Sequence, residues 1–147
     1  MTGDGGASPA AGSRPNEPQE PRLHEYPLPG GWRILAGRTE EDNDRLSLRV
    51  ARADDWWFHV RGQSGSHVVL QGPPGSKPDR DALRAAAAVA AWHSKSRSGG
   101  LVAVSCTQCR YVTKPRGARP GTVQIRRETV LRVHPALPAP PATGAQG

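Results

Sequence analysis

The sequence predicts an α+β fold, in which a mixed, largely antiparallel sheet of about seven or eight short strands packs against one long helix. Short runs of β-branched and aromatic residues alternate with clusters of glycine, proline and serine, a pattern typical of strands joined by turns. One alanine-rich stretch carries helix signals at both of its ends. The chain of 147 residues is long enough for one domain with a hydrophobic core.

The two ends of the chain are predicted to be disordered tails. Residues 1–29 consist mainly of Gly, Ala, Pro, Ser and Glu, and they hold few large apolar side chains whose burial could offset the entropy lost on ordering. The last part of this segment, Leu23–Pro29, contains Tyr26 and is a candidate for the edge of the domain. A second tail, rich in Pro and Ala, is expected at residues 135–147. The ordered domain is therefore predicted over residues 30–134.

The first predicted elements of the domain are two strands with an acidic segment between them. Trp32–Ala36 follows a Gly-Gly turn and is expected to be a short strand. The acidic segment Thr39–Asp44 favours a turn or a short helical start. Arg45–Val50 alternates between polar and apolar residues, and this period of two predicts a half-buried strand whose arginines face away from the core.

The central predicted element is a hairpin within Asp54–Leu70. Its apolar arms, Trp56–Val60 and His67–Leu70, flank a turn segment that holds two glycines and two serines. A loop at Arg61–Gly65 places His59 opposite His67, because partner numbers in an antiparallel pair keep a constant sum. Alternation then puts Trp57 on the face of the two histidines, and the pattern leaves open whether these residues bind a ligand or only pack.

The helix is predicted over Asp79–Arg97. Pro78 suits its first position, the acidic side chains that follow complement the positive N-terminal end, and Ala82–Ala91 has high helix propensity. Gly99-Gly100 is expected to end it. The alanines allow the helix to approach a sheet closely.

The last third of the chain is predicted to form three strands and one exposed loop. Leu101–Cys106 is expected to be a strand, and Arg110–Gly121 interleaves basic residues with turn formers, which predicts an exposed basic loop. Two further strands, Thr122–Arg126 and Thr129–Val133, are expected to be joined tightly near Arg127-Glu128.

Charge is unevenly distributed along the chain. The net charge is +7, but residues 84–147 hold ten Lys/Arg against one acid, whereas residues 1–83 hold ten against twelve. A concentrated positive field favours polyanionic partners, whose binding is salt-dependent. Charge alone therefore favours nucleic-acid binding.

The pair Cys106–Cys109 is the one motif that suggests metal or redox chemistry. A zinc site needs four ligands, and none of the histidines lies at a recognised spacing from this pair. A redox pair normally lies at a helix N-terminus, whereas this pair lies on or beside a predicted strand. No metal and no cofactor is therefore expected. The sequence also shows no run long enough for a signal peptide or a membrane span, so a cytoplasmic protein without a membrane partner is expected.

The order of these motifs resembles a known family, the RNA-binding domain of the NFACT proteins (NFACT-R), formerly a domain of unknown function. The matching segments extend from about Trp32 to Val133 and together are specific. In chain order they are Gly31–Arg38, Asn43-Asp44 with Leu46, Asp55–Val60, Gly65–Val68, Ala85–Ala91 with Ser94, and Val112–Val123. The chain resembles the free-standing bacterial form, because it does not contain the N-terminal domain and the coiled coil of the long members.

The resemblance implies an α+β domain that binds RNA. Long members of the family work on stalled large ribosomal subunits and contact tRNA. The expected partners are therefore tRNA or ribosomal RNA, with the large ribosomal subunit as a further candidate and a link to ribosome-associated quality control or RNA processing. Elongation of a nascent chain is not expected, because it needs the domains that are missing here. The sequence does not set the oligomeric state.

The residues expected to bind RNA fall into four groups. Basic side chains in turns and in the basic loop are candidate phosphate contacts, an exposed Trp57 is the candidate stacking platform, and two histidines lie beside it. The turn at Gly65-Ser66 offers backbone N–H groups to a phosphate, and Asn43-Asp44 matches the family motif. The full set is Arg38, Asn43, Asp44, Trp57, His59, Arg61, Gly65, Ser66, His67, Lys114, Arg116 and Arg119.

Two other functions are compatible with the sequence. In the first, the domain is an RNA-acting enzyme with His59 and His67 as general acid and base and Asp55 orienting one of them. In the second, it is a protein-docking module whose basic face binds an acidic partner.

Overall fold

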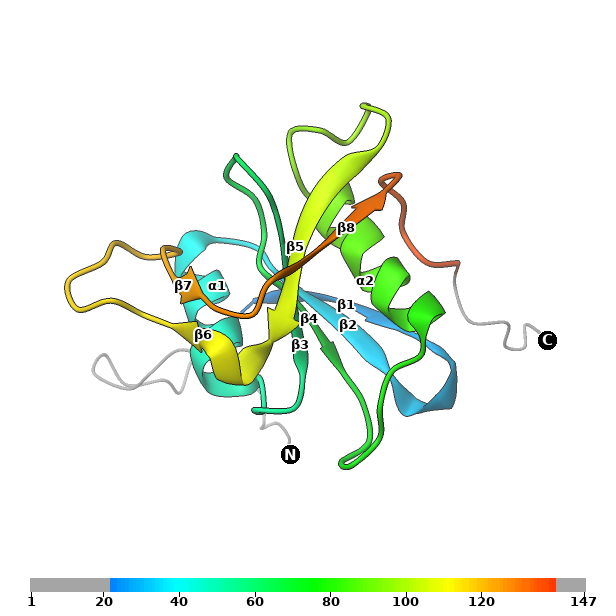
Figure 1. Cartoon of the computed structure of the whole chain (residues 1–147), viewed down its shortest axis with the longest axis horizontal. Coiled ribbons are helices and arrows are strands. Elements are labelled where there is room, and N and C mark those ends of the chain that lie inside the picture. Colours follow the sequence, from blue (N-terminus) through cyan, green and yellow to red (C-terminus); the bar gives the residue numbers. More distant parts are fainter. Residues whose placement is uncertain (1–21, 140–147) are drawn as a thin grey trace, which may run out of the picture.

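The computed structural model describes residues 22–139, and its main feature is a six-stranded antiparallel sheet (Figure 1). The strand order is β1-β2-β4-β3-β5-β8, and a separate two-stranded sheet pairs β6 with β7. The main sheet consists of β1 Leu23–Pro27, β2 Arg33–Gly37, β3 Trp56–Val60, β4 Val68–Gln71, β5 Val102–Gln108 and β8 Thr129–Val133. The small sheet consists of β6 Val112–Thr113 and β7 Gln124–Ile125. The predicted α+β class with a largely antiparallel sheet and one long helix is confirmed.

Helices cover both faces of the main sheet. The long helix α2, Arg80–Trp92, lies on one face, and α1, Glu40–Arg45, continues into a π-helical segment, Leu46–Val50, on the other. Short 3-10 turns at Pro29–Gly31 and Cys109–Tyr111 complete the regular structure. None of the helices in the described part of the chain is long and apolar enough to cross a membrane.

The central hairpin has the predicted register. Trp56 pairs with Leu70 and Phe58 with Val68, and the same constant sum places His59 opposite His67. The centroids of the two imidazole rings lie 5.5 Å apart, with the rings nearly perpendicular.

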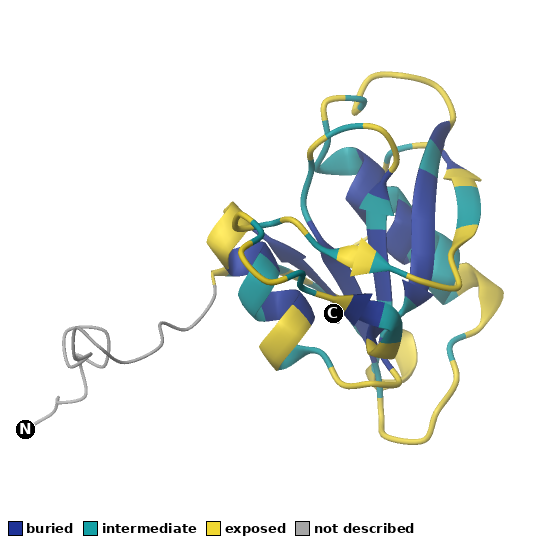
Figure 2. Ribbon diagram, turned by 60° about the vertical axis from the view of Figure 1, so that its left-hand side comes forward, coloured by how far each residue is buried: buried dark blue, intermediate teal, exposed yellow. Residues whose placement is uncertain are grey.

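The main core lies between α2 and the sheet. Phe58, Val60, Val68 and Leu70 from the hairpin are fully or almost fully buried there, against the alanines of α2. Ala86, Ala87, Ala90 and Ala91 are fully buried, so the helix packs its alanine face against the sheet. Figure 2 shows the central strands in the colour of buried residues, with exposed residues confined mainly to loops.

A second core lies on the other face of the sheet. It joins Leu35, Trp57 and Val69 from the strands to Leu46 from the helical segment and Val112 from β6. The face of the hairpin that carries Trp57 is therefore covered.

The covering segment corrects one prediction, because Arg45–Val50 is helical and not a strand. Thr39 caps the helix by accepting a hydrogen bond at its Oγ1 from the N–H of Asp42, 3.0 Å away, and the first turn is acidic. These signals stabilise the positive end of a helix. Leu46 is fully buried whereas Leu48 is 40 % exposed. Burial therefore does not follow the apolar alternation that suggested a strand.

The helix and the last strands also differ from the prediction. Helix α2 ends at Trp92 instead of Arg97, and Asp79 is its N-cap, so Pro78 lies before the helix. The two final strands belong to different sheets, because β7, shorter than predicted at Gln124–Ile125, pairs with β6 whereas β8 pairs with β5 at the edge of the main sheet.

The inner end of the predicted N-terminal tail, the candidate domain edge Leu23–Pro29, lies at the edge of the main sheet. Leu23–Pro27 forms β1, which pairs with the whole of β2 from Leu23 opposite Gly37 to Pro27 opposite Arg33. Past β8, the N–H of Ala136 donates to the carbonyl of Ala88 on α2, so the chain continues along this helix. The rest of the two predicted tails, residues 1–21 and 140–147, lies outside the described residues.

Candidate nucleic-acid interface

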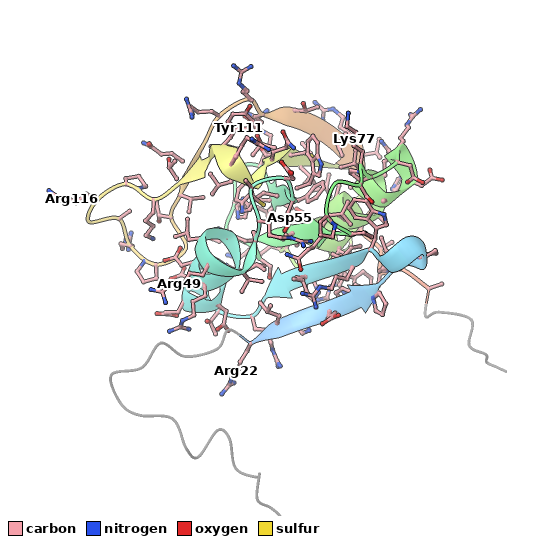
Figure 3. All side chains as sticks on the ribbon, turned by 90° about the horizontal axis from the view of Figure 1, so that it is seen from below. Arg22, Arg49, Asp55, Lys77, Tyr111 and Arg116 are labelled. Atoms are coloured by element: carbon pink, nitrogen blue, oxygen red, sulfur yellow. The ribbon has the colours of Figure 1, made fainter. Side chains whose placement is uncertain are left out.

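The most basic segment of the structure is a hairpin-like arm, which we call the basic arm and define as residues 110–127. It holds six Lys/Arg and no acid. The short strands β6 and β7 form its stem, and the loop between them projects from the side of the main sheet (Figure 1). Arg116 lies at the outer end of this loop in Figure 3, on the opposite side of the molecule from Lys77.

The loop of the arm is anchored at both ends by Asp44. One carboxylate oxygen of Asp44 lies 2.9 Å from Lys114 Nζ, and the other accepts a hydrogen bond from the N–H of Gly121, 3.0 Å away. Gly121 has a φ of +84°, a conformation that favours glycine. Lys114 also donates to the carbonyl of Arg119. In this structure Lys114 therefore holds the loop closed, instead of pointing freely at solvent as the loop arginines do.

Three of the predicted phosphate contacts are exposed side chains without an ion pair among residues 22–139. They are Arg38, Arg116 and Arg119. Arg61 differs, because its Nε lies 3.4 Å from Glu128 Oε2. Arg38 directly follows β2 beside the hairpin turn, where the hydroxyl of Ser66 donates to the carbonyl of Gly37, 2.8 Å away.

The stem of the arm contains a cluster that the sequence analysis missed. The guanidinium carbons of Arg126 and Arg127 lie 5.8 and 5.5 Å from the ring centroid of Tyr111. One sequence feature could have revealed this cluster. No acidic residue occurs from Arg110 to Arg127, so the basic segment extends beyond the predicted loop.

Trp57 does not offer the predicted stacking surface. Its side chain is only 3 % exposed, and its indole Nε1 donates to Ser47 Oγ, 2.9 Å away. The prediction of an exposed platform was wrong because the helical segment Leu46–Val50, expected to be a strand, covers this face of the sheet.

His67 is buried and fully hydrogen-bonded. Its Nε2 lies 3.1 Å from the carbonyl of Gly121, which can only accept, so Nε2 carries the proton. Its Nδ1 lies 2.7 Å from Ser47 Oγ. Burial, and then the neighbouring His59, lowers the pKa of His67 to about 4, so the ring is neutral at pH 7. His67 therefore ties the hairpin to the helical segment and to the basic arm.

His59 is half-buried beside Trp57, and its ring centroid lies 5.9 Å from that of the indole. Burial lowers its pKa, although hydrogen bonds with the backbone of Val60 and Gly65 act in the opposite direction. Of the two paired histidines, His59 is the more accessible.

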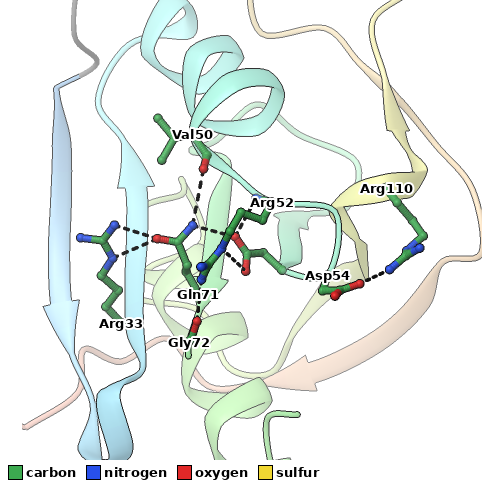
Figure 4. A network of polar contacts seen from close by, with 8 residues as sticks. Arg33, Val50, Arg52, Asp54, Gln71, Gly72 and Arg110 are labelled. Atoms are coloured by element: carbon green, nitrogen blue, oxygen red, sulfur yellow. Dashed lines mark hydrogen bonds and ion pairs between the residues drawn. The ribbon is translucent and has the colours of Figure 1, made fainter. Parts of the chain in front are cut away.

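Asp55 does not orient either histidine. Its Oδ2 accepts hydrogen bonds from Gln71 Nε2 at 2.7 Å and from the N–H of Arg52 at 2.8 Å (Figure 4). Gln71 in turn accepts from Arg33, 2.7 Å away. The predicted acid/base pair therefore has no carboxylate from Asp55, which belongs to a separate polar network with Gln71 on β4 and Arg33 on β2.

Asn43 connects helix α1 to the hairpin turn. Its Oδ1 accepts from the N–H of His67 at 3.0 Å, and its Nδ2 donates to the carbonyl of Gly65 at 3.4 Å. Gly65 also forms an isolated bridge with Ser94 at the end of α2. The Asn43-Asp44 pair therefore positions the hairpin turn and the basic arm from one short helix. That the backbone N–H groups of Gly65 and Ser66 donate hydrogen bonds to a phosphate stays a prediction.

The two cysteines are free, buried thiols that lie in different cores. Cys106 packs in the core under α2 and Cys109 in the core on the opposite face. Burial raises the pKa of Cys106 to about 12 and also raises that of Cys109. Among the described residues, no group of three or more His, Cys, Asp or Glu side chains could hold a metal ion.

Two cavities lie around Lys77, away from the basic arm. One, of about 420 Å³, is lined by Trp32, Asp79 and Asp81 among others, and the other, of about 410 Å³, is lined by Trp56 and Asp54. Their carboxylates make this end of the molecule less favourable for a polyanion than the arm.

The chain is similar to several known proteins. Residues 24–127 match the model of the NFACT protein RNA binding domain. The Rqc2 homolog RqcH of Bacillus subtilis is 37% identical over 124 residues, which are 84% of this chain and 21% of that protein. RqcH of Streptococcus suis is 36% identical over 102 residues, 69% of this chain and 18% of that protein. The chain thus spans about a fifth of the length of these relatives.

A solved structure gives the same result. The C-terminal part of the fibronectin/fibrinogen-binding protein from Streptococcus suis aligns with a TM-score of 0.72 and 32% identity, over 86% of this chain and 49% of that one. The family model covers most of the described domain, from β1 to the end of the basic arm. This chain therefore belongs to the family of NFACT protein RNA-binding domains.

Proposed function

We propose that this domain binds RNA without catalysis and that the basic arm supplies its phosphate contacts. The observation that carries the proposal is the arm itself, which holds six cations and no acid and keeps Arg116 and Arg119 exposed at its tip. Guanidinium groups donate paired hydrogen bonds to phosphate oxygens, so exposed arginines are well suited to an RNA backbone. Arg38, beside the hairpin turn, is a further exposed candidate for a phosphate contact.

The proposed ligand is tRNA or ribosomal RNA, and the large ribosomal subunit is a candidate partner. The relatives named RqcH and the match to an RNA-binding family support this choice. Catalysis is not part of the proposal, because both ring nitrogens of His67 are engaged and Asp55 contacts neither histidine. Turnover of end-labelled tRNA that is lost in a His59→Ala, His67→Ala variant would overturn this part.

A charge-matched pair of variants tests the arm. We expect Arg116→Ala, Arg119→Ala to flatten the dependence of log affinity on log salt by about 1.4 units, since each contact to a single strand contributes about 0.7. Lys77→Ala, Arg80→Ala removes the same charge on the other side of the molecule and should change the slope little. The measurement is fluorescence anisotropy with a single-stranded oligouridylate at several salt concentrations. Equal slopes for wild type and the arm variant would exclude the arm as the RNA site.

Protein docking is the second candidate function, because the similar solved structure bears the name of a fibronectin/fibrinogen-binding protein. The basic arm would then bind an acidic protein surface. Co-purification with and without ribonuclease separates the two functions. Partners that are lost after nuclease treatment support RNA binding, and partners that survive it support protein docking.

A further inference from the structure

We infer that Tyr111, Arg126 and Arg127 form a phosphate clamp in the stem of the basic arm, a second contact for the RNA backbone that is separate from the loop tip. This inference rests on the proposed RNA-binding function. Its ligand is a phosphodiester group, and it assigns a role to three residues outside the predicted site.

The first observation is an uncompensated pair of like charges. Both guanidinium carbons lie within 6 Å of one phenol ring, at 5.8 and 5.5 Å from its centroid. No carboxylate pairs with either arginine within residues 22–139. The acid next in sequence, Glu128, accepts from the hydroxyl of Ser105 and pairs with Arg61. Both charges thus lie against one ring without a carboxylate partner among the described residues.

The second observation is that the backbone fixes this arrangement. Arg127 has a φ of 55°, and it is the one non-glycine residue with a positive φ in the described chain. The hydroxyl of Thr107, itself only 1 % exposed, lies 2.6 Å from the carbonyl of Arg126 and 3.3 Å from that of Arg127. The N–H of Arg126 donates to the carbonyl of Tyr111 at 3.1 Å. A buried donor on β5 therefore holds a strained residue in place, a feature that occurs most often at binding sites.

These contacts favour an anion with several acceptor oxygens. The ring holds the planar guanidinium groups through cation–π attraction and leaves their N–H groups for a ligand. A phosphate between the two arginines would accept charge-assisted hydrogen bonds from both and would neutralise their repulsion. Because hydrogen bonds already fix the turn that carries both arginines, the proposed clamp needs little ordering of the backbone when it binds this ligand.

The test uses three variants of the full chain and the oligouridylate probe. Arg126→Ala, Arg127→Ala should flatten the salt dependence by about 1.4 units, and Arg127→Gly, which keeps the positive φ without the guanidinium, by about 0.7. Lys77→Ala, Arg80→Ala is the charge-matched control. If Arg127→Gly binds with the wild-type slope, the turn matters only as a fold element and the clamp is excluded.

A second experiment, without RNA, tests the clamp separately from the proposed function. Titration of inorganic phosphate, followed by ¹⁵N-resolved NMR, should shift the backbone signals of Tyr111 and Arg127 in wild type, whereas the signal of Tyr111 should not move in the Arg126→Ala, Arg127→Ala variant. One outcome is that the salt dependence of RNA affinity flattens in Arg116→Ala, Arg119→Ala and stays at the wild-type value in the clamp variants. That result would overturn the clamp and leave RNA binding by the loop intact. Phosphate shifts without any RNA binding would support the anion site but overturn its assignment to RNA. Wild-type protein that binds neither probe would overturn both.

Discussion

At the scale of single residues, Gly37 shows why the end of β2 accepts no side chain. A Cβ built there would lie 2.0 Å from Asn43 Oδ1, which already accepts from the N–H of His67. The amide of Asn43 thus occupies the space of a side chain and holds the hairpin turn. Size, and not backbone conformation, requires glycine at this position.

We expect Gly37→Ala to lower the free energy of unfolding by about 1–3 kcal/mol, because the new methyl group must displace Asn43. Gly100→Ala is the matched control, since a Cβ at Gly100 meets nothing within 4 Å. Urea unfolding measures both variants. Equal stability of the two would show that the contact at Asn43 relaxes at no cost.

At Arg127, in contrast to Gly37, the backbone conformation and not the space for a side chain favours glycine. We expect Arg127→Gly to raise the free energy of unfolding by up to about 1 kcal/mol, since glycine adopts a φ of 55° without the steric cost of a Cβ. Arg126, whose φ is not positive, provides the control, and glycine there should be neutral or destabilising. Thermal unfolding by circular dichroism distinguishes the two positions.

His67 links stability to pH. Its pKa falls from 6.5 to about 4 in the folded state, so folding favours the neutral ring. The stability that His67 supplies is complete above pH 6.5 and is lost as the pH falls toward 4, with a slope of up to about 1.4 kcal/mol per pH unit. In urea unfolding between pH 4 and 7, His67→Gln should show a weaker pH dependence than wild type. An unchanged slope in this variant would place the titrating group elsewhere.

At the scale of elements, the short helix α1 determines more than its length suggests. Its N-cap Thr39, its buried Asn43 and the anchor Asp44 fix the hairpin turn and the basic arm, and its continuation Leu46–Val50 covers Trp57. Loss of this helix would therefore disturb both the second core and the candidate interface.

Removal of the cap tests this role. We expect Thr39→Ala to lower the free energy of unfolding by about 1 kcal/mol, because the N–H of Asp42 loses its acceptor. Thr39→Ser keeps a hydroxyl at the same place and should stay close to wild type. Chemical denaturation measures both, and a Ser variant as unstable as the Ala variant would mean that the methyl group, and not the cap, matters.

At the scale of the whole molecule, the basic side chains fall into two groups, those that form ion pairs within the domain and those that are exposed without one. Lys114, Arg61 and Arg110 pair with Asp44, Glu128 and Asp54. Within the described domain, no ion pair involves the other arginines of the arm, Arg116, Arg119, Arg126 and Arg127. The surface that remains for a ligand is thus more basic than the average of the chain.

Lys114 and Arg116 should separate these two roles. Lys114→Ala should lower the free energy of unfolding by about 0.5–1 kcal/mol and speed amide exchange at Gly121, because a partly buried ion pair is lost. Arg116→Ala should leave both unchanged and weaken RNA binding only. Unchanged exchange in Lys114→Ala would show that Asp44 holds the loop without the lysine.

The sequence alone determined the α+β class, the hairpin register with His59 opposite His67, the core of the long helix and the basic loop. These features follow from local propensity, from the period of apolar residues and from charge, all of which act between neighbours in the chain. Tertiary structure decided the rest. Trp57 and His67 became core residues because a capped helix covers their face, Lys114 became an anchor because Asp44 lies opposite it, and Arg127 joined Tyr111 because Thr107 on β5 holds the turn. In each case the deciding partner is distant in sequence, so no local pattern records it.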